Sequence, residues 1–329
     1  MTVLVCGGAG YIGSHAVASL LNQGEEVVVI DNIQTGHRSA VLEQATFYDG
    51  DMRDEQFLDN VFQYNKIDSV IHFAANSLVG ESVEKPLEYY DNNVGGAITL
   101  LKTMAKNDVK HIVFSSTAAT YGEPDQIPIL ESDPTIPTNP YGETKLAIEK
   151  MLKWAEQAHG IRSIVFRYFN VAGADPNGRL GEDHRPETHL IPIILQVALG
   201  KREKIMVFGD DYDTPDGTCI RDYVHVNDLV DVHLLAVRAL QKGAESDIYN
   251  LGNGHGFSVK EVIETVRQVT GHPIPAEVAP RRPGDPAKLV ASSEKAKNKL
   301  GWKPNYSDLE TMIETAWNWC RKHPDGYSS

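Results

Sequence analysis

The run Asn139–Glu149, N-P-Y-G-E-T-K-L-A-I-E, carries a tyrosine and a lysine at a spacing suited to acid–base chemistry. Asn139 can cap a helix and Pro140 suits its first turn, so a helix is predicted to begin here. Tyr141 and Lys145 stand four residues apart and therefore share one helix face. An ammonium group and the positive end of a helix both lower the pKa of a phenol. We interpret Tyr141 as a general base and Lys145 as its activator.

Tyr-x-x-x-Lys also occurs in ordinary amphipathic helices, and the glycine-rich N-terminus is what favours catalysis here. A short apolar strand, Val3–Cys6, leads into G-G-A-G-Y-I-G, and a predicted helix follows at Ser14–Gln23. Gly7, Gly10 and Gly13 permit a tight turn, so that backbone N–H groups can approach a pyrophosphate at the helix N-terminus. The pattern predicts a dinucleotide-binding loop.

An acidic residue follows the second predicted strand. Glu26–Ile30 is apolar and ends at Asp31, eighteen residues after Gly13. A carboxylate at this point can bind the adenosine ribose diol and would repel a 2′-phosphate. We therefore predict NAD rather than NADP, although His37 and Arg38 supply positive charge nearby.

Strand and helix patterns alternate through the first half of the chain. The further predicted elements are strands Thr46–Tyr48, Ser69–Phe73, His111–Phe114 and Ser163–Tyr168, and helices Glu55–Tyr64, Pro86–Asn107 and Pro140–His159. Such alternation predicts an α/β fold with a doubly wound parallel (Rossmann) sheet, whose ligands lie beyond the carboxyl ends of the strands. Thr117 follows one such strand, so we expect it to face the same cofactor as Tyr141.

Composition excludes several partners and sites. The formal net charge of −14 over 329 residues argues against binding to nucleic acid or to an anionic membrane. Three scattered cysteines suggest neither a disulfide framework nor a zinc site. The start lacks a basic region and no apolar run has membrane-spanning length, so we expect a cytoplasmic protein.

Several motifs together resemble the extended short-chain dehydrogenase/reductase family. In the first half these are G-G-A-G-Y-I-G, H-F-A-A, S-S-T-A-A-T-Y-G, N-P-Y-G-E-T-K and R-Y-F-N. The runs Arg167–Pro192, Phe208–His225 and Ala279–Asp285 narrow the resemblance to the members that invert C4 of UDP-hexoses. The resemblance covers essentially the whole chain.

The resemblance implies an activity, a cofactor and an assembly. It implies interconversion of UDP-glucose and UDP-galactose, in galactose metabolism, through a transient 4-keto sugar and tightly bound NAD. It also implies a homodimer in which helices Asp91–Lys106 and Tyr141–Ala158 of two subunits form a four-helix bundle.

Site residues follow from the same resemblance. The implied catalytic residues are Thr117, Tyr141 and Lys145. The implied cofactor residues are Gly7, Gly10, Tyr11, Ile12, Gly13, Asp31, Asn32, Asp51, Met52, Phe73, Ala74, Ala75, Asn92, Tyr141, Lys145 and Phe169. The implied substrate residues are Thr117, Tyr141, Asn170, His189, Leu190, Phe208, Arg221, Tyr223, Arg282, Asp285 and Leu289. Many members have lysine at Ser77 and asparagine at His189, so contacts at these two positions differ in this chain.

Leu289 occupies a position that, in the resembling family, lies on the wall of the hexose pocket. A tyrosine there excludes a 2-acetamido group, whereas a smaller side chain leaves room for it. We therefore predict that UDP-N-acetylglucosamine is a substrate as well; the alternative is that Leu289 packs in the core and a neighbour narrows the pocket.

The domains are predicted to be interleaved along the chain. Residues 1–168 plus about 222–252 are assigned to the NAD-binding domain. Residues about 169–221 plus 253–329 are assigned to a smaller, discontinuous substrate domain. The strand-then-helix pattern of Asp222–Leu240 is expected to return the chain to the main sheet.

Charged groups in the second half favour a diphosphate ligand over a metal. Arg221 and Arg282 carry planar donors suited to phosphate, although each alone is typical of a surface residue. His184 and His189 have no comparable partner further along the sequence, so no metal site is predicted. The segment Glu182–Arg185 is interpreted as a solvated or ion-paired loop rather than as an acid–base group.

Three alternatives fit the fold but not all of the residues. A sugar-nucleotide dehydratase needs an acidic pair beside Thr117, where this chain has Ala118 and Ala119. A dehydrogenase acting on a lipid or flavonoid would not need the two arginines. A dinucleotide-sensing regulatory protein would usually lack the Tyr141–Lys145 pair.

Overall fold

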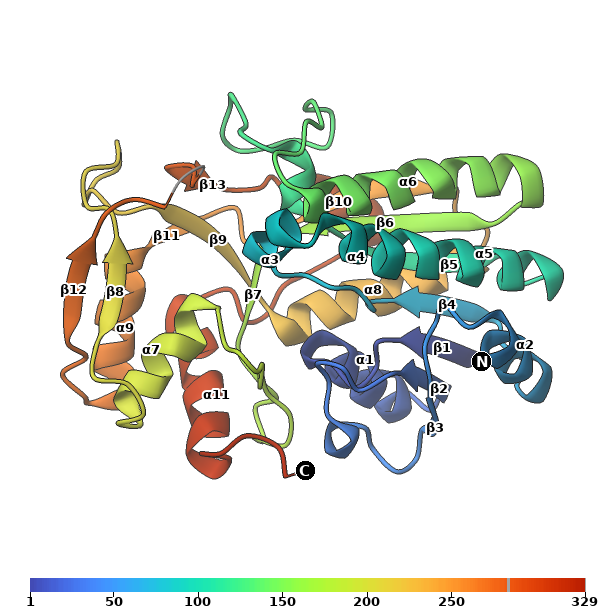
Figure 1. Ribbon diagram of the computed structural model, residues 1–329, viewed down its shortest axis with the longest axis horizontal. Helices are drawn as coiled ribbons and strands as arrows, with labels where there is room; N and C mark the ends of the chain where they lie inside the picture. Colours follow the sequence, from blue (N-terminus) through green and yellow to red (C-terminus); the bar gives the residue numbers. More distant parts are fainter. Residues whose placement is uncertain (283–284, 329) are drawn as a thin grey trace.

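A seven-stranded parallel sheet forms the larger part of the molecule (Figure 1). The computed structural model describes residues 1–282 and 285–328. In order across the sheet, the strands are β10 (Asp247–Leu251), β6 (Arg162–Tyr168), β5 (His111–Thr117), β4 (Ser69–His72), β1 (Thr2–Cys6), β2 (Glu26–Asp31) and β3 (Thr46–Asp49). The strand order reverses beside β1, which is where such sheets bind ligands.

Helices cover both faces of this sheet because its strands are apolar on both sides. Val3 and Val5 of β1 pack into one core and Leu4 and Cys6 into the other. The helices of the first core are α1 (Tyr11–Asn22) and α8 (Val226–Gln241); those of the second are α2 (Glu55–Tyr64), α5 (Gly96–Lys106) and α6 (Pro140–His159). The predicted doubly wound α/β fold is confirmed.

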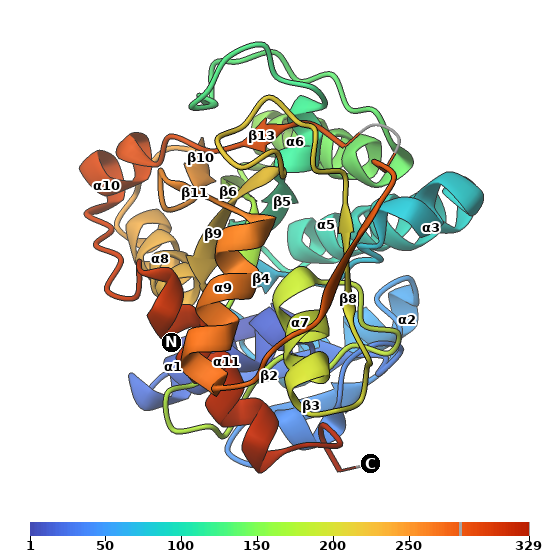
Figure 2. The same cartoon turned by 90° about the vertical axis from the view of Figure 1, so that its left-hand side faces the viewer.

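A smaller region lies beside the carboxyl ends of the strands, at the left of Figure 1 and facing the viewer in Figure 2. Its first sheet contains β7 (Asn170–Ala172), β9 (Ile220–His225), β11 (Gly256–Ser258) and β13 (Lys288–Leu289), and its second contains β8 (Ile205–Phe208) and β12 (Ala276–Ala279). Helices α7 (Leu190–Ala198), α9 (Val259–Thr270) and α11 (Leu309–Lys322) pack with them around a separate apolar core. Helix α10 (Glu294–Leu300) contacts β10 and α8.

The predicted helix Pro86–Asn107 is interrupted. The chain forms α3 (Val79–Glu84), α4 (Pro86–Tyr89), then a π-helical turn at Tyr90–Gly95, and only then α5. The wider turn presents Asn93, whose buried amide exchanges hydrogen bonds with the backbone of Asn76. Tertiary hydrogen bonds of this kind compensate for the irregular turn, and π turns are frequent at functional sites.

The predicted return of the chain at Asp222–Leu240 is only partly correct. The strand-then-helix pattern is present, as β9 and α8. However, β9 pairs with β7, β11 and β13 in the small sheet, whereas α8 covers the large sheet and β10 joins it. The division into two interleaved domains stays a prediction.

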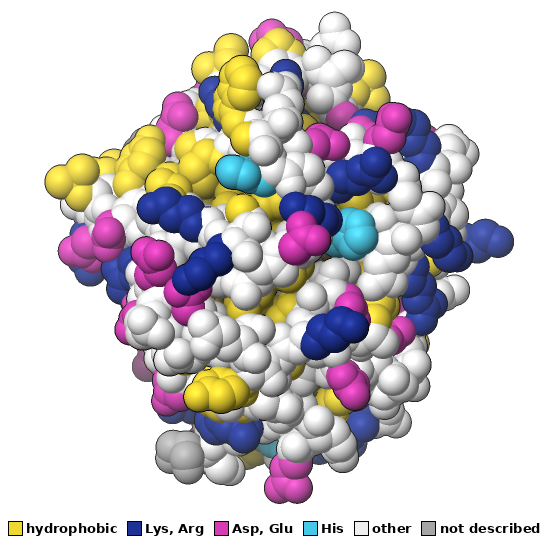
Figure 3. Space-filling view, turned by 90° about the vertical axis from the view of Figure 1, so that its right-hand side faces the viewer, with side chains coloured by type: hydrophobic (Ala, Val, Ile, Leu, Met, Phe, Trp, Pro, Cys, Tyr) yellow, Lys and Arg dark blue, Asp and Glu magenta, His cyan; other side chains and the backbone are white. Residues whose placement is uncertain are grey.

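The face seen in Figure 3 carries charged side chains of both signs and a group of hydrophobic side chains toward its upper left. Lysine and arginine side chains there are interspersed with acidic ones among the described residues. Among the described residues, no helix combines the length and apolar character needed to cross a bilayer.

Candidate active site

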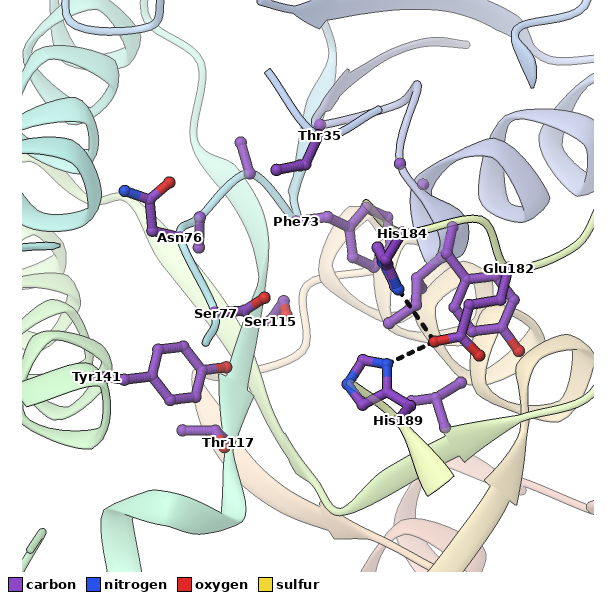
Figure 4. Close-up of a pocket in the computed structure, with 18 of the residues that line it drawn as sticks. Thr35, Phe73, Asn76, Ser77, Ser115, Thr117, Tyr141, Glu182, His184 and His189 are labelled. Atoms are coloured by element: carbon purple, nitrogen blue, oxygen red, sulfur yellow. Dashed lines mark hydrogen bonds and ion pairs between the residues drawn. The ribbon is translucent and has the colours of Figure 1, made fainter. Parts of the chain in front are cut away.

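A cavity of about 460 Å³ opens at the carboxyl ends of the parallel strands. One wall comes from the loops after β1, β2, β4 and β5 and from the start of α6. The opposite wall comes from β7, from the segment between β7 and α7, and from the start of α7 (Figure 4). The cavity therefore lies between the large sheet and the smaller region.

The glycine-rich loop forms one end of this cavity. Gly7 has φ +80°, and a Cβ at Gly7 would lie 2.7 Å from the backbone nitrogen of Ala74. A Cβ at Gly13 would lie 2.0 Å from the carbonyl oxygen of Gly7, so a side chain at either position would disrupt the turn. Helix α1 begins directly after Gly10, and its N-terminus faces the cavity with Tyr11 and Ile12. This is the geometry of a site for a phosphate group.

Asp31 ends β2 and is held by backbone donors. Its carboxylate accepts hydrogen bonds from the N–H groups of Ala9 (3.0 Å) and Ile33 (2.9 Å). Burial raises the pKa of Asp31, and these two N–H groups lower it in part. The glycine loop, the helix N-terminus and this carboxylate line one cavity, so the residues present fit a dinucleotide.

Most of the predicted cofactor residues line the cavity. They are Gly7, Gly10, Tyr11, Ile12, Gly13, Asp31, Asn32, Asp51, Met52, Phe73, Ala74, Ala75, Asn92, Tyr141 and Phe169. Lys145 is the exception, because it lies behind the cavity wall. The individual roles of all these cofactor residues stay predictions.

Tyr141 and Thr117 lie side by side on one wall (Figure 4). Asn139 caps α6 by accepting a hydrogen bond from the N–H of Gly142 (2.9 Å), which fixes where the helix begins. Burial raises the pKa of Tyr141 to about 12, and the Thr117 hydroxyl offsets this only in part. The net pKa shift of Tyr141 in the protein chain alone is therefore opposite to the predicted lowering, because desolvation is the largest effect.

Lys145 is almost completely buried beneath this pair. Its ammonium group donates a hydrogen bond to the carbonyl oxygen of Ser115 (2.7 Å) and lies 5.0 Å from the centre of the Phe114 ring. Burial lowers the pKa of Lys145 to about 7, although the Glu149 carboxylate opposes this shift. Lys145 is thus poised between its charged and neutral forms at neutral pH.

A second titratable group faces the cavity from the opposite wall. Glu182 accepts a hydrogen bond from His189 Nδ1 (2.5 Å) and lies 3.1 Å from His184 Nδ1. Burial would raise the pKa of Glu182, but the two histidines outweigh it and hold the pKa at about 2. Burial would lower the pKa of His184, but Glu182 and Glu187 raise it to about 10. The predicted ion-paired loop is present here.

The predicted substrate residues divide into two sets. Thr117, Tyr141, Asn170, His189, Leu190 and Tyr223 line the cavity. Phe208, Arg221, Arg282, Asp285 and Leu289 do not line it.

The second set forms a cluster at the far end of β9. Arg221 pairs with Asp285, and the Arg282 guanidinium lies 4.1 Å from the centre of the Phe208 ring. Leu289 pairs in register with Arg221 across β13 and β9. Pro283 and Gly284, between these segments in the A-P-R-R-P-G-D motif, lie outside the described residues.

Some residues that line the cavity are absent from the predicted site. They include Thr35, Asn76, Ser115, Ser116, Glu182 and His184. Ser115 and Ser116 lie near the end of β5, directly before Thr117, and their polar type at a strand end was a usable signal. Glu182 and His184 carry no comparable signal, because their segment reaches the cavity only through the packing of the smaller region.

Comparison with known proteins agrees with this geometry. A model of the NAD dependent epimerase/dehydratase family matches residues 3–252. The chain belongs to this family.

Similar proteins extend the match to full length. The chain is 68% identical over 329 residues to a UDP-glucose 4-epimerase of Halalkalibacterium halodurans, covering 100% of this chain and 98% of the relative. A crystal structure of a UDP-glucose 4-epimerase is 65% identical with a TM-score of 0.99 and full coverage of both chains. The Bifidobacterium longum UDP-glucose 4-epimerase, crystallised with NAD⁺ and UDP, is 44% identical with a TM-score of 0.93, covering 99% of this chain and 100% of that one. These matches confirm the predicted family, its fold and its NAD-dependent epimerase class.

Proposed function

We propose that this enzyme interconverts UDP-glucose and UDP-galactose by inversion at C4, with no net oxidation. The observation that carries the proposal is the position of Tyr141 and Thr117 on the wall of the cavity that begins at the glycine-rich loop. The hydroxyl groups of Tyr141 and Thr117 therefore face the same cavity as the glycine-rich loop that is suited to bind a dinucleotide. The names of the similar proteins support the choice of sugar nucleotide.

The chain's own residues handle the proton of the sugar 4-hydroxyl. Thr117 hydrogen-bonds this hydroxyl, and Tyr141 takes its proton and later returns it. When bound, NAD⁺ supplies the hydride acceptor and then the donor, and its positive ring favours the Tyr141 phenolate that burial alone disfavours. Lys145 adds positive charge below the phenol when it is protonated.

Inversion requires the 4-keto sugar to present its other face, so the nucleotide must be held while the hexose turns. Arg221 and Arg282 are suited to bind the diphosphate, because a guanidinium can bond two oxygens at once. Tyr223 of β9 lines the cavity and lies two residues from Arg221. We propose that the nucleotide extends from the cavity along β9 toward this cluster.

A dehydratase is disfavoured by the turn after Thr117. Ala118 and Ala119 begin the 3₁₀ turn Ala118–Tyr121 directly after β5. Methyl groups at these positions cannot protonate or deprotonate the sugar C5–C6 unit, which elimination of the 6-hydroxyl requires. Inversion without elimination is the chemistry that remains.

A product assay tests the proposal. The enzyme is incubated with UDP-glucose and NAD⁺, and the products are separated by chromatography. Absorbance is followed at about 340 nm, where reduced nicotinamide absorbs. We expect UDP-galactose with no build-up of NADH. Net NADH formation would identify a dehydrogenase, and a 4-keto-6-deoxy sugar would identify a dehydratase.

We also propose that the enzyme is a cytoplasmic homodimer that pairs through α5 and α6. Both helices lie along one side of the molecule (Figure 1). Ile98 of α5 and Trp154 of α6 are exposed, Trp154 to 67%. Val83 of α3 and Leu87 of α4 are also exposed, and both of these helices contact α6. Exposed apolar groups on neighbouring helices are typical of a subunit interface.

Trp154→Glu is expected to convert the dimer to a monomer, because a carboxylate cannot be buried unpaired in an apolar interface. Light scattering after size-exclusion chromatography measures the mass. Tyr64→Glu, at a residue exposed to 79% on α2, is the control and should remain dimeric. A monomeric wild type would contradict the assembly and leave the proposed activity untouched.

A further inference from the structure

Four residues in the segment between β7 and α7 bring potential metal-ligand atoms close together. They are Glu182, His184, Glu187 and His189, and one nitrogen or oxygen from each lies within 4.8 Å of all the others. The spacing of the two histidines alone predicts no metal site. The fold adds two carboxylates to the two imidazoles, which completes a four-ligand set.

Three of the separations are close to those in a tetrahedral metal site. Zinc lies about 2.0–2.2 Å from nitrogen and oxygen ligands, so neighbouring ligand atoms are about 3.4 Å apart. His184 Nδ1 lies 3.1 Å from Glu182 Oε1 and 3.7 Å from Glu187 Oε2. His189 Nδ1 lies 3.5 Å from Glu187 Oε1. The hydrogen bond of 2.5 Å between His189 and Glu182 is shorter than this and must lengthen by about 1 Å when a metal binds.

The alternative is a network of ion pairs with no metal, in which His184 Nδ1 lies 3.1 Å from Glu182 and 3.7 Å from Glu187. Among the described residues, neither contact of this buried nitrogen has hydrogen-bond geometry. A buried polar atom without a well-aligned hydrogen bond is costly. A cation at the centre of the four atoms would satisfy this nitrogen and both carboxylates.

The two carboxylates are held in place for such a role. Both glutamate side chains are almost completely buried, and among the described residues their ion-pair partners are only the two histidines. Glu187 Oε1 accepts hydrogen bonds from the N–H groups of Thr188 (2.7 Å) and His189 (2.8 Å). Supporting hydrogen bonds of this kind orient metal ligands.

We propose that Glu182, His184, Glu187 and His189 bind one divalent transition-metal ion of the zinc, cobalt or nickel class. Mixed imidazole and carboxylate ligands suit these borderline ions. The two carboxylates offset the charge of the ion. Because Glu182, His184 and His189 line the cavity across from Tyr141, bound metal would fix this wall (Figure 4).

Zinc titration of untagged, chelator-treated enzyme tests the site. Binding is measured by competition with a chromophoric chelator, and we expect one Zn²⁺ per chain. His184→Asn and Glu187→Gln should each weaken binding at least about tenfold. His159→Asn and Glu314→Gln change exposed residues elsewhere and should bind Zn²⁺ as the wild type does. Circular dichroism checks that each variant is folded.

Cobalt gives a second readout that needs no variant. Tetrahedral Co²⁺ absorbs visible light much more strongly than octahedral Co²⁺, so the wild-type spectrum reports the geometry directly. Strong absorption that Zn²⁺ displaces supports the site. Absence of stoichiometric binding, wild-type affinity in folded Glu187→Gln, or a weak octahedral spectrum would overturn it and leave an ion-pair network.

Discussion

Two groups of titratable side chains lie on opposite sides of the cavity, and their pKa values shift in opposite senses. On one wall, burial raises the pKa of Tyr141 to about 12 and lowers that of Lys145 to about 7, so both shift toward neutral forms. On the other wall, the pKa of Glu182 falls to about 2 and that of His184 rises to about 10, so both shift toward charged forms.

The difference lies in the partners, not in the depth of burial. Tyr141 has a neutral hydroxyl nearby, whereas Glu182 and His184 are direct ion-pair partners. Desolvation penalises any charge, and a close opposite charge can outweigh it. The first wall is therefore arranged so that a charged ligand can change its protonation, whereas the second keeps its charge at neutral pH.

Removing the Tyr141 hydroxyl from the first wall should have the largest effect on turnover. Tyr141→Phe is expected to lower kcat by about 10²-fold or more, in line with general acid–base contributions. The ring remains, so binding of NAD and UDP should persist. Steady-state product assays measure kcat, and Tyr64→Phe on exposed α2 is the control. Near-normal turnover would assign the proton transfer to another residue.

Lys145→Met tests whether burial without a direct ion-pair partner lowers the pKa of Lys145 in the first wall. The folded-state pKa of about 7 lies below the ordinary lysine value of 10.5, so the unfolded chain binds more protons between these two values. Lys145 therefore destabilises the wild type progressively as pH falls from about 10.5 to about 7, by up to about 1.4 kcal/mol per pH unit. The difference in unfolding free energy between variant and wild type should grow in favour of the variant over this range and then level off.

Urea unfolding at a series of pH values measures this difference. Lys153→Met, at an exposed position on the same helix, is the control and should show no such trend. A flat difference between Lys145→Met and wild type would mean that Lys145 keeps its charge when buried, and the contrast between the walls would fail.

Asp31 is an intermediate case, because its partners are backbone N–H groups rather than charged side chains. Asp31→Ala should weaken NAD binding about tenfold or more and relax discrimination against NADP, since the repulsive carboxylate is gone. Titration with both cofactors measures this. Asp49→Ala, at the exposed neighbouring strand end, is the control. An unchanged cofactor preference would contradict the role of Asp31.

The smallest effect is expected beyond the second wall, at Leu289. We predict that the wild type also epimerises UDP-N-acetylglucosamine, and that Leu289→Tyr lowers kcat/KM for this sugar about tenfold relative to UDP-glucose by steric exclusion. UDP-glucose has no 2-acetamido group for the added phenol to displace, so its turnover should be nearly unaffected. Lys288→Tyr is the control. No turnover of the acetylated sugar by the wild type would end this proposal.

The sequence alone determined the features that depend on neighbours along the chain. The extents of α2 and α6, the glycine loop with Asp31 after the next strand, and the shared face of Tyr141 and Lys145 all follow from local spacing. Helical and strand periodicities, caps and tight turns are local properties, so the glycine loop, Asp31 and the Tyr141–Lys145 pair were predictable from spacing. The other predicted residues of the first wall came from the family resemblance.

Tertiary structure decided whatever depends on segments distant in the chain. The π-helical turn at Tyr90–Gly95 is stabilised by Asn76, and the small sheet that contains β9 also contains the distant β7, β11 and β13. The direction of the Tyr141 pKa shift depends on how completely surrounding segments exclude water, which spacing cannot reveal. The Glu182–His184–Glu187–His189 cluster likewise exists because folding turns its segment inward and aligns its side chains against the cavity.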